Sequence, residues 1–167
     1  GGAVPRQCIP RVAEGVRAFS IDDATTVEID DAFSVRELPG GRTSVGIHIA
    51  APAVSILHGD AYDAVARSRL STVYMPGRKI TMLPDDVVRA FSLAAGEPRP
   101  ALSLYIELDE QGAPVSHRTA VERVTVAANL ALDKVGEAFA NPLPSPADPP
   151  WAAEMRVLWK LVQRLSE

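Results

Sequence analysis

Five carboxylates lie within ten consecutive residues of this sequence, at Asp22, Asp23, Glu28, Asp30 and Asp31. Ionised acids this close together repel one another by roughly 1 kcal/mol per pair at contact range in water, and by more near a protein surface. Such a cluster persists when it is solvated, when it caps a helix, or when a cation holds it. Hard ions such as Mg²⁺ bind one or two carboxylates directly and keep several waters or substrate phosphates. The segment therefore indicates metal-assisted phosphate chemistry.

A solvated loop or a helix N-cap is the simpler interpretation of an Asp-rich stretch, and two features oppose it. Val27 and Ile29 alternate with the acids, and the stretch leads directly into residues 32–35, Ala-Phe-Ser-Val, which are typical of a strand. A calcium-binding EF-hand loop is a poor match, because the acids lack its one-three-five spacing, its central glycine and its terminal glutamate. The acidic stretch is thus expected to be partly buried beside a sheet.

The whole chain has the composition of a globular domain. It has 167 residues, 47% of them apolar, and a net charge of −4, which argues against a generic basic nucleic-acid coat while leaving local phosphate binding open. The longest apolar runs are too short to span a bilayer, and no basic-then-apolar signal segment opens the chain. We expect a cytoplasmic protein with no membrane partner.

Hairpins and helices are mixed along the chain. Alternating apolar patterns and turn residues predict strands over residues 16–21, 32–38, 43–50, 71–75, 101–108 and 115–126. The residues Pro39-Gly40-Gly41-Arg42 form a clear hairpin signal between two of these strands. Predicted helices follow an Asp60 cap over 61–70, begin again near Pro84, and cover 130–140 after an Asn129 cap. This order predicts an α+β fold, with a mixed or antiparallel sheet of hairpins flanked by helices.

Four stretches in a fixed order carry a family resemblance. They are Ile21-Asp22-Asp23-Ala24 with Ile29-Asp30-Asp31-Ala32; Val45-Gly46-Ile47-His48-Ile49-Ala50; Tyr74-Met75-Pro76-Gly77 with Met82-Leu83-Pro84; and Ser92-Leu93 with Arg99-Pro100-Ala101-Leu102-Ser103. Together, over roughly residues 16 to 136, the chain resembles the catalytic (RNB) domain of the ribonuclease II family of exoribonucleases.

The resemblance implies processive 3′→5′ hydrolysis of single-stranded RNA to nucleoside 5′-monophosphates, with one or two Mg²⁺ ions, or Mn²⁺ in their place. It implies that Asp22 and Asp31 bind metal, that Asp30 is their essential neighbour in the same metal site, and that Glu28 assists catalysis. Tyr74 matches a family aromatic that stacks on the 3′-terminal base; a half-buried strand aromatic is the alternative. Stacking of this kind is sequence-tolerant, which suits an enzyme that digests any RNA.

The resemblance also divides the chain and locates its departures. Residues 1–15 are a lead-in, 16–140 the N-terminal half of the catalytic domain, 141–150 a proline-rich linker, and 151–167 an amphipathic helix of the same domain. Partners for that helix are expected in the remainder of the domain, which with RNA-binding modules belongs to a longer protein. Glu28 stands where bacterial members usually have Asp, Ala51 where many have Asp, and Leu132 where an RNA-contacting Tyr is common.

Two alternatives to an exoribonuclease remain open on the sequence alone. One is a catalytically silent RNA-binding homologue of the same fold, favoured by the departures at Glu28, Ala51 and Leu132; retention of Asp22, Asp30 and Asp31 opposes it. The other is an acidic interaction module, which predicts no affinity for RNA. His48 lies in an apolar run, and we interpret it as a packed, hydrogen-bonded histidine instead of a catalytic base.

Overall fold

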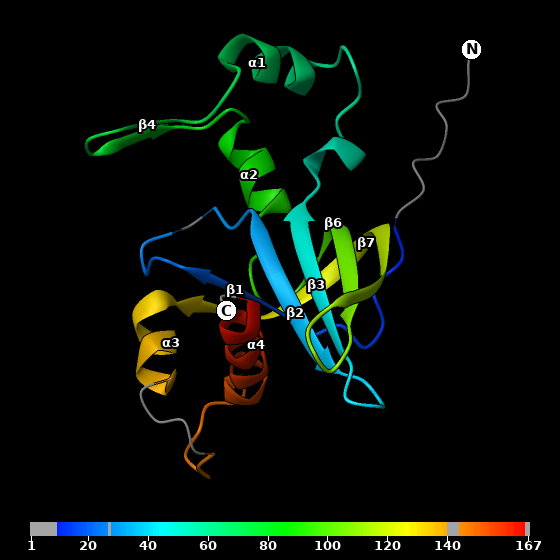
Figure 1. Ribbon diagram of the computed structural model, residues 1–167. Helices are drawn as coiled ribbons and strands as arrows, with labels where there is room; N and C mark the ends of the chain where they lie inside the picture. Colours follow the sequence, from blue (N-terminus) through cyan, green and yellow to red (C-terminus); the bar gives the residue numbers. More distant parts are fainter. Residues whose placement is uncertain (1–9, 27, 140–143, 166–167) are drawn as a thin grey trace.

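A closed five-stranded barrel forms the centre of the computed structural model, which describes residues 10–26, 28–139 and 144–165 (Figure 1). Its strands follow the order β1-β2-β3-β6-β7, with bounds β1 Ala18–Asp22, β2 Asp31–Glu37, β3 Thr43–Ala50, β6 Pro98–Leu108 and β7 Pro114–Ala131. All neighbours are antiparallel except β1 and β7, which pair in parallel and close the barrel. The α+β class expected from the sequence is confirmed.

The β2–β3 hairpin follows directly from its turn residues. Gly40 and Gly41 have φ values of 73° and 68°, in the left-handed region that glycine adopts at no steric cost. The Leu38 amide donates to the Arg42 carbonyl oxygen at 2.7 Å and closes the loop. The turn thus sets the register in which Asp31 pairs with Ile49 at the far end of the two strands.

The chain between β3 and β6 covers one end of the barrel with small elements (Figure 1). In order these are η1 Pro52–Val54, α1 Ala61–Arg69, β4 Val73–Met75, β5 Arg78–Ile80 and α2 Asp85–Phe91. The Asp60 side chain accepts a hydrogen bond from the Asp63 amide and caps α1 as the sequence predicts. The strands β4 and β5 form a separate hairpin that projects away from the barrel (Figure 1).

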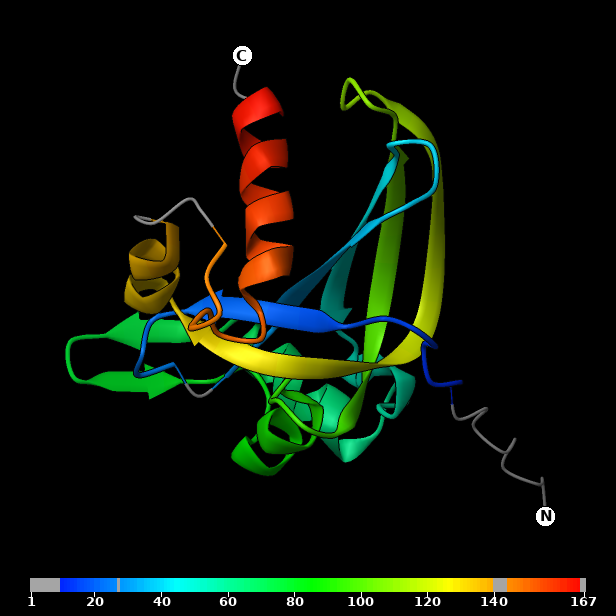
Figure 2. The same cartoon turned by 90° about the horizontal axis from the view of Figure 1, so that it is seen from below.

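Two C-terminal helices, α3 Leu132–Phe139 and α4 Ala152–Leu165, cover the side of the barrel (Figure 2). Met155 of α4 is fully buried in one cluster with Phe19, Leu130 and Val135. The prediction that the apolar face of this helix needs a partner outside the chain is therefore wrong for its first turns, because the barrel already buries them. Further along the helix Trp159 keeps 45% of its surface exposed.

Asn129 is not a helix cap, which corrects the sequence prediction. It lies within β7, and its amide nitrogen donates to Ser20 Oγ at 2.9 Å and to the Leu93 carbonyl oxygen at 3.0 Å. Its side-chain oxygen accepts from the Ala95 amide at 2.8 Å. Parallel pairing with β1 continues β7 to Ala131, so α3 begins only at residue 132. Among the described residues, no helix has the length and apolar character needed to cross a membrane.

Candidate active site

The acidic segment, residues 22–31, connects the end of β1 to the start of β2. Asp22 is the last residue of β1 and Asp31 the first of β2. The two strands pair with Phe19 opposite Phe33; further along, Asp22 lies opposite Ala131 of β7 and Asp31 lies opposite Ile49 of β3. Asp22 and Asp31 thus lie at the ends of two adjacent barrel strands, next to the connection that carries Glu28 and Asp30.

Ile29 fixes the backbone of the acidic segment. Its side chain is buried, its amide donates to Ser92 Oγ at 2.9 Å, and its carbonyl oxygen accepts from the Leu93 amide at 2.8 Å. The carbonyl oxygen of Asp30 accepts from the Ala50 amide at 2.8 Å. Three of the stretches that carried the family resemblance, far apart in sequence, meet at this point. Their contacts hold Glu28 and Asp30 on either side of the buried Ile29. The segment is therefore held in place around Ile29, whereas residues 23–26 are exposed as in an ordinary solvated loop.

The electrostatics of the segment centre on Asp30. Burial raises the pKa of the Asp30 carboxyl above its usual range, and the charge of Glu28 raises it further. Lys79 acts in the opposite direction, while Asp31 and Asp22 add smaller increases. The structure therefore brings the three other predicted acids within electrostatic range of Asp30.

Two buried carboxylate oxygens in the segment, Asp22 Oδ2 and Glu28 Oε2, accept no hydrogen bond in the structure. Glu28 Oε2 forms an ion pair with Lys79 Nζ, so it has an electrostatic partner. Asp22 Oδ2 is an unsatisfied buried acceptor, which is costly for a charged group. All-oxygen donors of this kind fit a hard cation such as Mg²⁺. Within the described residues no three acidic, His or Cys side chains converge on one point, so binding would require side-chain rotation.

A cavity of about 220 Å³ adjoins the acidic segment and accounts for the partial desolvation of the Asp30 carboxyl, although the residue as a whole is exposed. Glu28 and Asp30 line it on one side, opposite mainly apolar residues from β3, η1, the 81–84 stretch and α2, including Ile49, Pro52, Met82, Leu83, Val87, Val88 and Phe91. Apolar walls displace water from the carboxylates and strengthen their mutual repulsion. Carboxylates in this setting have a reason to bind a cation.

Tyr74, the predicted base-stacking residue, lies on β4 with 74% of its surface exposed. The alternative of a half-buried strand aromatic is therefore excluded, and the ring has a free face for a ligand. Lys79 lies directly opposite on β5, with Nζ 5.4 Å from the centroid of the Tyr74 ring. Sequence analysis missed the partnership of Lys79 with Glu28, since no spacing rule connects a residue of the acidic segment with one on β5.

His48 is a structural residue, as predicted. It is fully buried, with Nε2 3.0 Å from Ser34 Oγ and Nδ1 2.8 Å from Ser103 Oγ, and its ring meets Tyr105 edge-on at 5.5 Å. Burial lowers the pKa of His48 to about 4. An imidazole with so low a pKa is a poor proton acceptor at neutral pH, so this serine–histidine pair is not an activated nucleophile.

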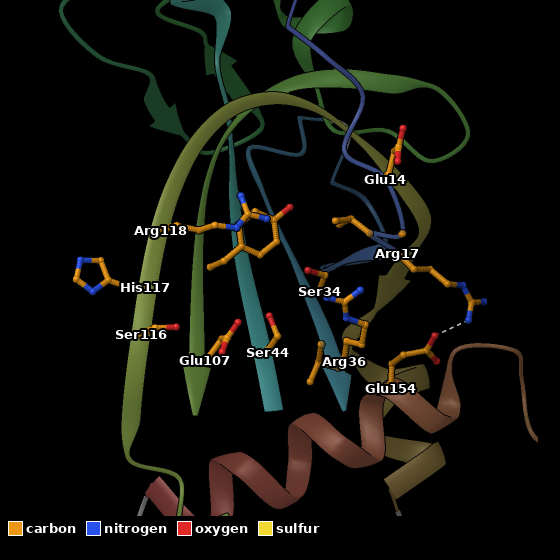
Figure 3. Close-up of a pocket in the computed structure, with 14 residues that line it drawn as sticks. Glu14, Arg17, Ser34, Arg36, Ser44, Glu107, Ser116, His117, Arg118 and Glu154 are labelled. Atoms are coloured by element: carbon orange, nitrogen blue, oxygen red, sulfur yellow. Dashed lines mark hydrogen bonds and ion pairs between the residues drawn. The ribbon is translucent and has the colours of Figure 1, made fainter. Parts of the chain in front are cut away.

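A larger cavity, of about 490 Å³, opens on the barrel beyond the His48 cluster, away from the acidic segment (Figure 3). Arg118 lies over the Tyr105 ring at 3.8 Å from its centroid, and Arg17 pairs with Glu154 across the opening. No residue predicted from the sequence as catalytic or RNA-binding lines this cavity. The two cavities therefore divide the barrel into an acidic end and a mixed-charge end.

The remaining departures from the family pattern lie near the site without completing it. Ala51 follows β3 and donates its amide to the Pro100 carbonyl oxygen at 3.0 Å. Leu132 opens α3 with 62% of its surface exposed. Neither side chain can supply the carboxylate or the phenol that many members have at these positions.

Fold and site together define a barrel with a carboxylate cluster at one end, and comparison with known proteins gives the family. The RNB domain matches residues 13–167, and the chain belongs to this family. It is 32% identical over 152 residues to an uncharacterized ribonuclease, sll1290, of Synechocystis, covering 89% of this chain and 23% of that protein. It is 39% identical over 94 residues to exoribonuclease 2 of Vibrio cholerae, covering 56% of this chain and 14% of that protein. The chain spans less than a quarter of the length of these relatives.

Solved structures share the fold at low identity. RNase R of Mycoplasma genitalium, in complex with ribose-methylated single-stranded RNA, superposes with a TM-score of 0.83 at 19% identity, covering 95% of this chain and 25% of that one. Yeast Ssd1, described as a pseudonuclease, superposes with a TM-score of 0.77 at 22% identity, covering 93% of this chain and 19% of that one. The fold thus occurs in an RNA-bound ribonuclease and in an inactive relative.

Proposed function

We propose that this chain is the N-terminal half of the catalytic domain of a cytoplasmic, Mg²⁺-dependent, processive 3′→5′ exoribonuclease that degrades single-stranded RNA to nucleoside 5′-monophosphates. The carrying observation is the acidic segment, where Asp22 Oδ2 is buried without a hydrogen-bond donor beside three further acids. Family membership supports hydrolysis of RNA. The remainder of the domain and separate RNA-binding modules are proposed to lie in the full-length protein.

Each acid has a proposed role. Asp22, Asp30 and Asp31 hold one or two Mg²⁺ ions, or Mn²⁺, and the buried backbone of Ile29 keeps Asp30 in place between them. When bound, such an ion lowers the pKa of a coordinated water and neutralises charge on the phosphate. Glu28 assists by fixing the segment, and the exposed ring of Tyr74 accepts the terminal base by stacking.

A catalytically silent RNA-binding homologue is the second candidate. The family includes inactive relatives, such as yeast Ssd1 and an inactive DIS3L2 exonuclease of Arabidopsis thaliana, and Glu28, Ala51 and Leu132 depart from the common pattern. Retention of the aspartates opposes it, because neutral replacement would relieve their repulsion. The silent homologue predicts RNA binding without any Mg²⁺-dependent product.

A time course on 5′-labelled single-stranded oligoadenylate, with Mg²⁺ or with EDTA, tests the proposal in the full-length natural protein. We expect Mg²⁺-dependent fragments that shorten from the 3′ end. Asp30→Asn should slow their appearance by at least about 100-fold, the scale of a misplaced catalytic group. Asp23→Asn is the matched control, because Asp23 is exposed and lies outside the proposed site.

The outcomes separate the candidates. RNA binding with no product in either metal condition supports the silent homologue. Equal rates for the wild type and Asp30→Asn would place the chemistry outside the acidic segment. No RNA binding at all would support an acidic interaction module instead.

A further inference from the structure

The β4–β5 hairpin has little packing of its own. Each strand has three residues, and all six are exposed. An isolated two-stranded hairpin is at best marginally stable in water. Its base is held by the Met82 amide, which donates to Thr72 Oγ1 at 3.1 Å, and by Arg69, which donates to the Thr81 carbonyl oxygen at 2.9 Å. These two hydrogen bonds hold the base of the hairpin. They do not fix the direction in which its strands point.

Lys79 connects the strands of the hairpin to the acidic segment. Its Nζ forms an ion pair with Glu28 Oε2, and the two side chains are only 31% and 13% exposed. In Figures 1 and 2 the hairpin lies alongside the connection between β1 and β2. Because buried Ile29 fixes the backbone next to Glu28, this ion pair ties the exposed hairpin to a rigid point.

The pairing register of β4 and β5 shows that the Lys79–Glu28 ion pair orients Tyr74. Tyr74 is directly opposite Lys79, so their side chains share one face of the hairpin, whereas Met75 and Arg78 are opposite each other on the other face. Lys79 Nζ lies 5.4 Å from the Tyr74 ring centroid, within cation–π range. When Lys79 contacts Glu28, the Tyr74 ring must stand on the face turned toward the acidic segment.

We propose that Lys79 is a positioning residue, whose ion pair with Glu28 holds the Tyr74 ring beside the acidic segment so that a terminal RNA base stacks there. The inference rests on the proposed function for the identity of the stacked ligand. It gives Glu28 a specific role, because its carboxylate is committed to the hairpin while Asp22, Asp30 and Asp31 are left to bind metal. Glu28 stands where Asp is usual, and its longer side chain lets the carboxylate reach Lys79.

Hydrogen exchange across residues 71–82 tests the ion pair in metal-free full-length protein. We expect Lys79→Met and Glu28→Gln each to speed exchange of the hairpin amides about fivefold, the scale of a partly exposed ion pair. Lys79→Arg should restore the wild-type rate. Arg78→Met removes the same charge from the other face and should leave exchange unchanged. Equal exchange in Lys79→Met and Arg78→Met would overturn the proposal.

Binding of single-stranded oligoadenylate in EDTA tests the positioning of Tyr74 without any turnover. We expect Lys79→Met to weaken binding about tenfold relative to Arg78→Met, because stacking is lost in addition to charge. Tyr74→Ala should weaken binding about tenfold in the wild type and no more than about twofold in the Lys79→Met background. An undiminished Tyr74 effect in that background would refute positioning. A silent homologue would still give these binding results, so failure of the nuclease assay leaves this inference separately testable.

Discussion

Two polar clusters on the same barrel differ in how completely their side chains are satisfied. In the His48 cluster both ring nitrogens have hydroxyl partners, on Ser34 and Ser103, at 3.0 and 2.8 Å. In the acidic segment Asp22 Oδ2 is equally hidden from water and has no hydrogen-bond partner. A fully satisfied cluster stabilises the barrel by itself, whereas an unsatisfied one gains stability only from a ligand. The contrast shows that the His48 cluster is complete within the chain, whereas Asp22 of the proposed metal site still has an unused acceptor.

Gly46→Ala should give the largest effect and test the structural side of the contrast. A Cβ at Gly46 would lie 2.4 Å from Ser34 Oγ and 2.9 Å from His48 Nε2, so the cluster must shift. We expect a loss of about 3 kcal/mol in the free energy of unfolding, measured by denaturant titration. Gly136→Ala is the control, because nothing lies within 4 Å of its added Cβ. An unchanged stability for Gly46→Ala would show that the cluster is loosely packed.

The pH dependence of stability tests the same cluster. His48 has a pKa of about 4 in the folded protein, below its ordinary 6.5, so the unfolded chain binds the proton more readily between these values. Stability should therefore be full above about pH 6.5 and decline as the pH falls to about 4, by roughly 2–3 kcal/mol from this residue. Unfolding free energies of the wild type and His48→Gln across that range measure it. A variant with the wild-type slope would assign the dependence to other groups.

Asp22→Asn should stabilise the metal-free protein, unlike Gly46→Ala, and it tests the acidic segment. Without divalent ions, replacing a buried carboxylate that has no donor should raise the free energy of unfolding by about 1 kcal/mol. Mg²⁺ should raise the melting temperature of the wild type and not that of Asp22→Asn. Asp23→Asn is the exposed control and should respond to Mg²⁺ like the wild type. Destabilisation by Asp22→Asn would mean that Asp22 has a structural partner.

Local sequence signals predicted the elements that local forces determine. The Gly40-Gly41 pair fixed one hairpin because its turn needs left-handed backbone at both positions, and Asp60 capped α1 through a bond three residues away. That Asp22, Glu28 and Asp31 act on the Asp30 carboxyl was likewise predictable from their proximity in sequence, although within the described residues the side chains do not converge on one point. His48 was predicted correctly from its apolar surroundings alone.

The features that sequence analysis missed depend on pairings across the fold. Asn129 has the composition of a cap, yet pairing with β1 keeps it in a strand and turns its amide toward Ser20 and Leu93. Met155 was expected to need an absent partner, because the sequence does not reveal that the barrel wall lies beside α4. Lys79 and Glu28 meet only because the fold places the β4–β5 hairpin alongside the acidic segment.

The parallel closure of the barrel also sets a sequence of events during synthesis. Ser20 of β1 and Asn129 of β7 are bonded across 109 residues, so β1 keeps one open edge until β7 has been made. At about 5–20 residues per second this interval lasts roughly 5–20 s. Asp22 pairs with Ala131 at the end of β7, so its strand partner exists only after this long interval. A nascent chain therefore cannot close the barrel around the acidic segment until β7, which ends at Ala131, has been made.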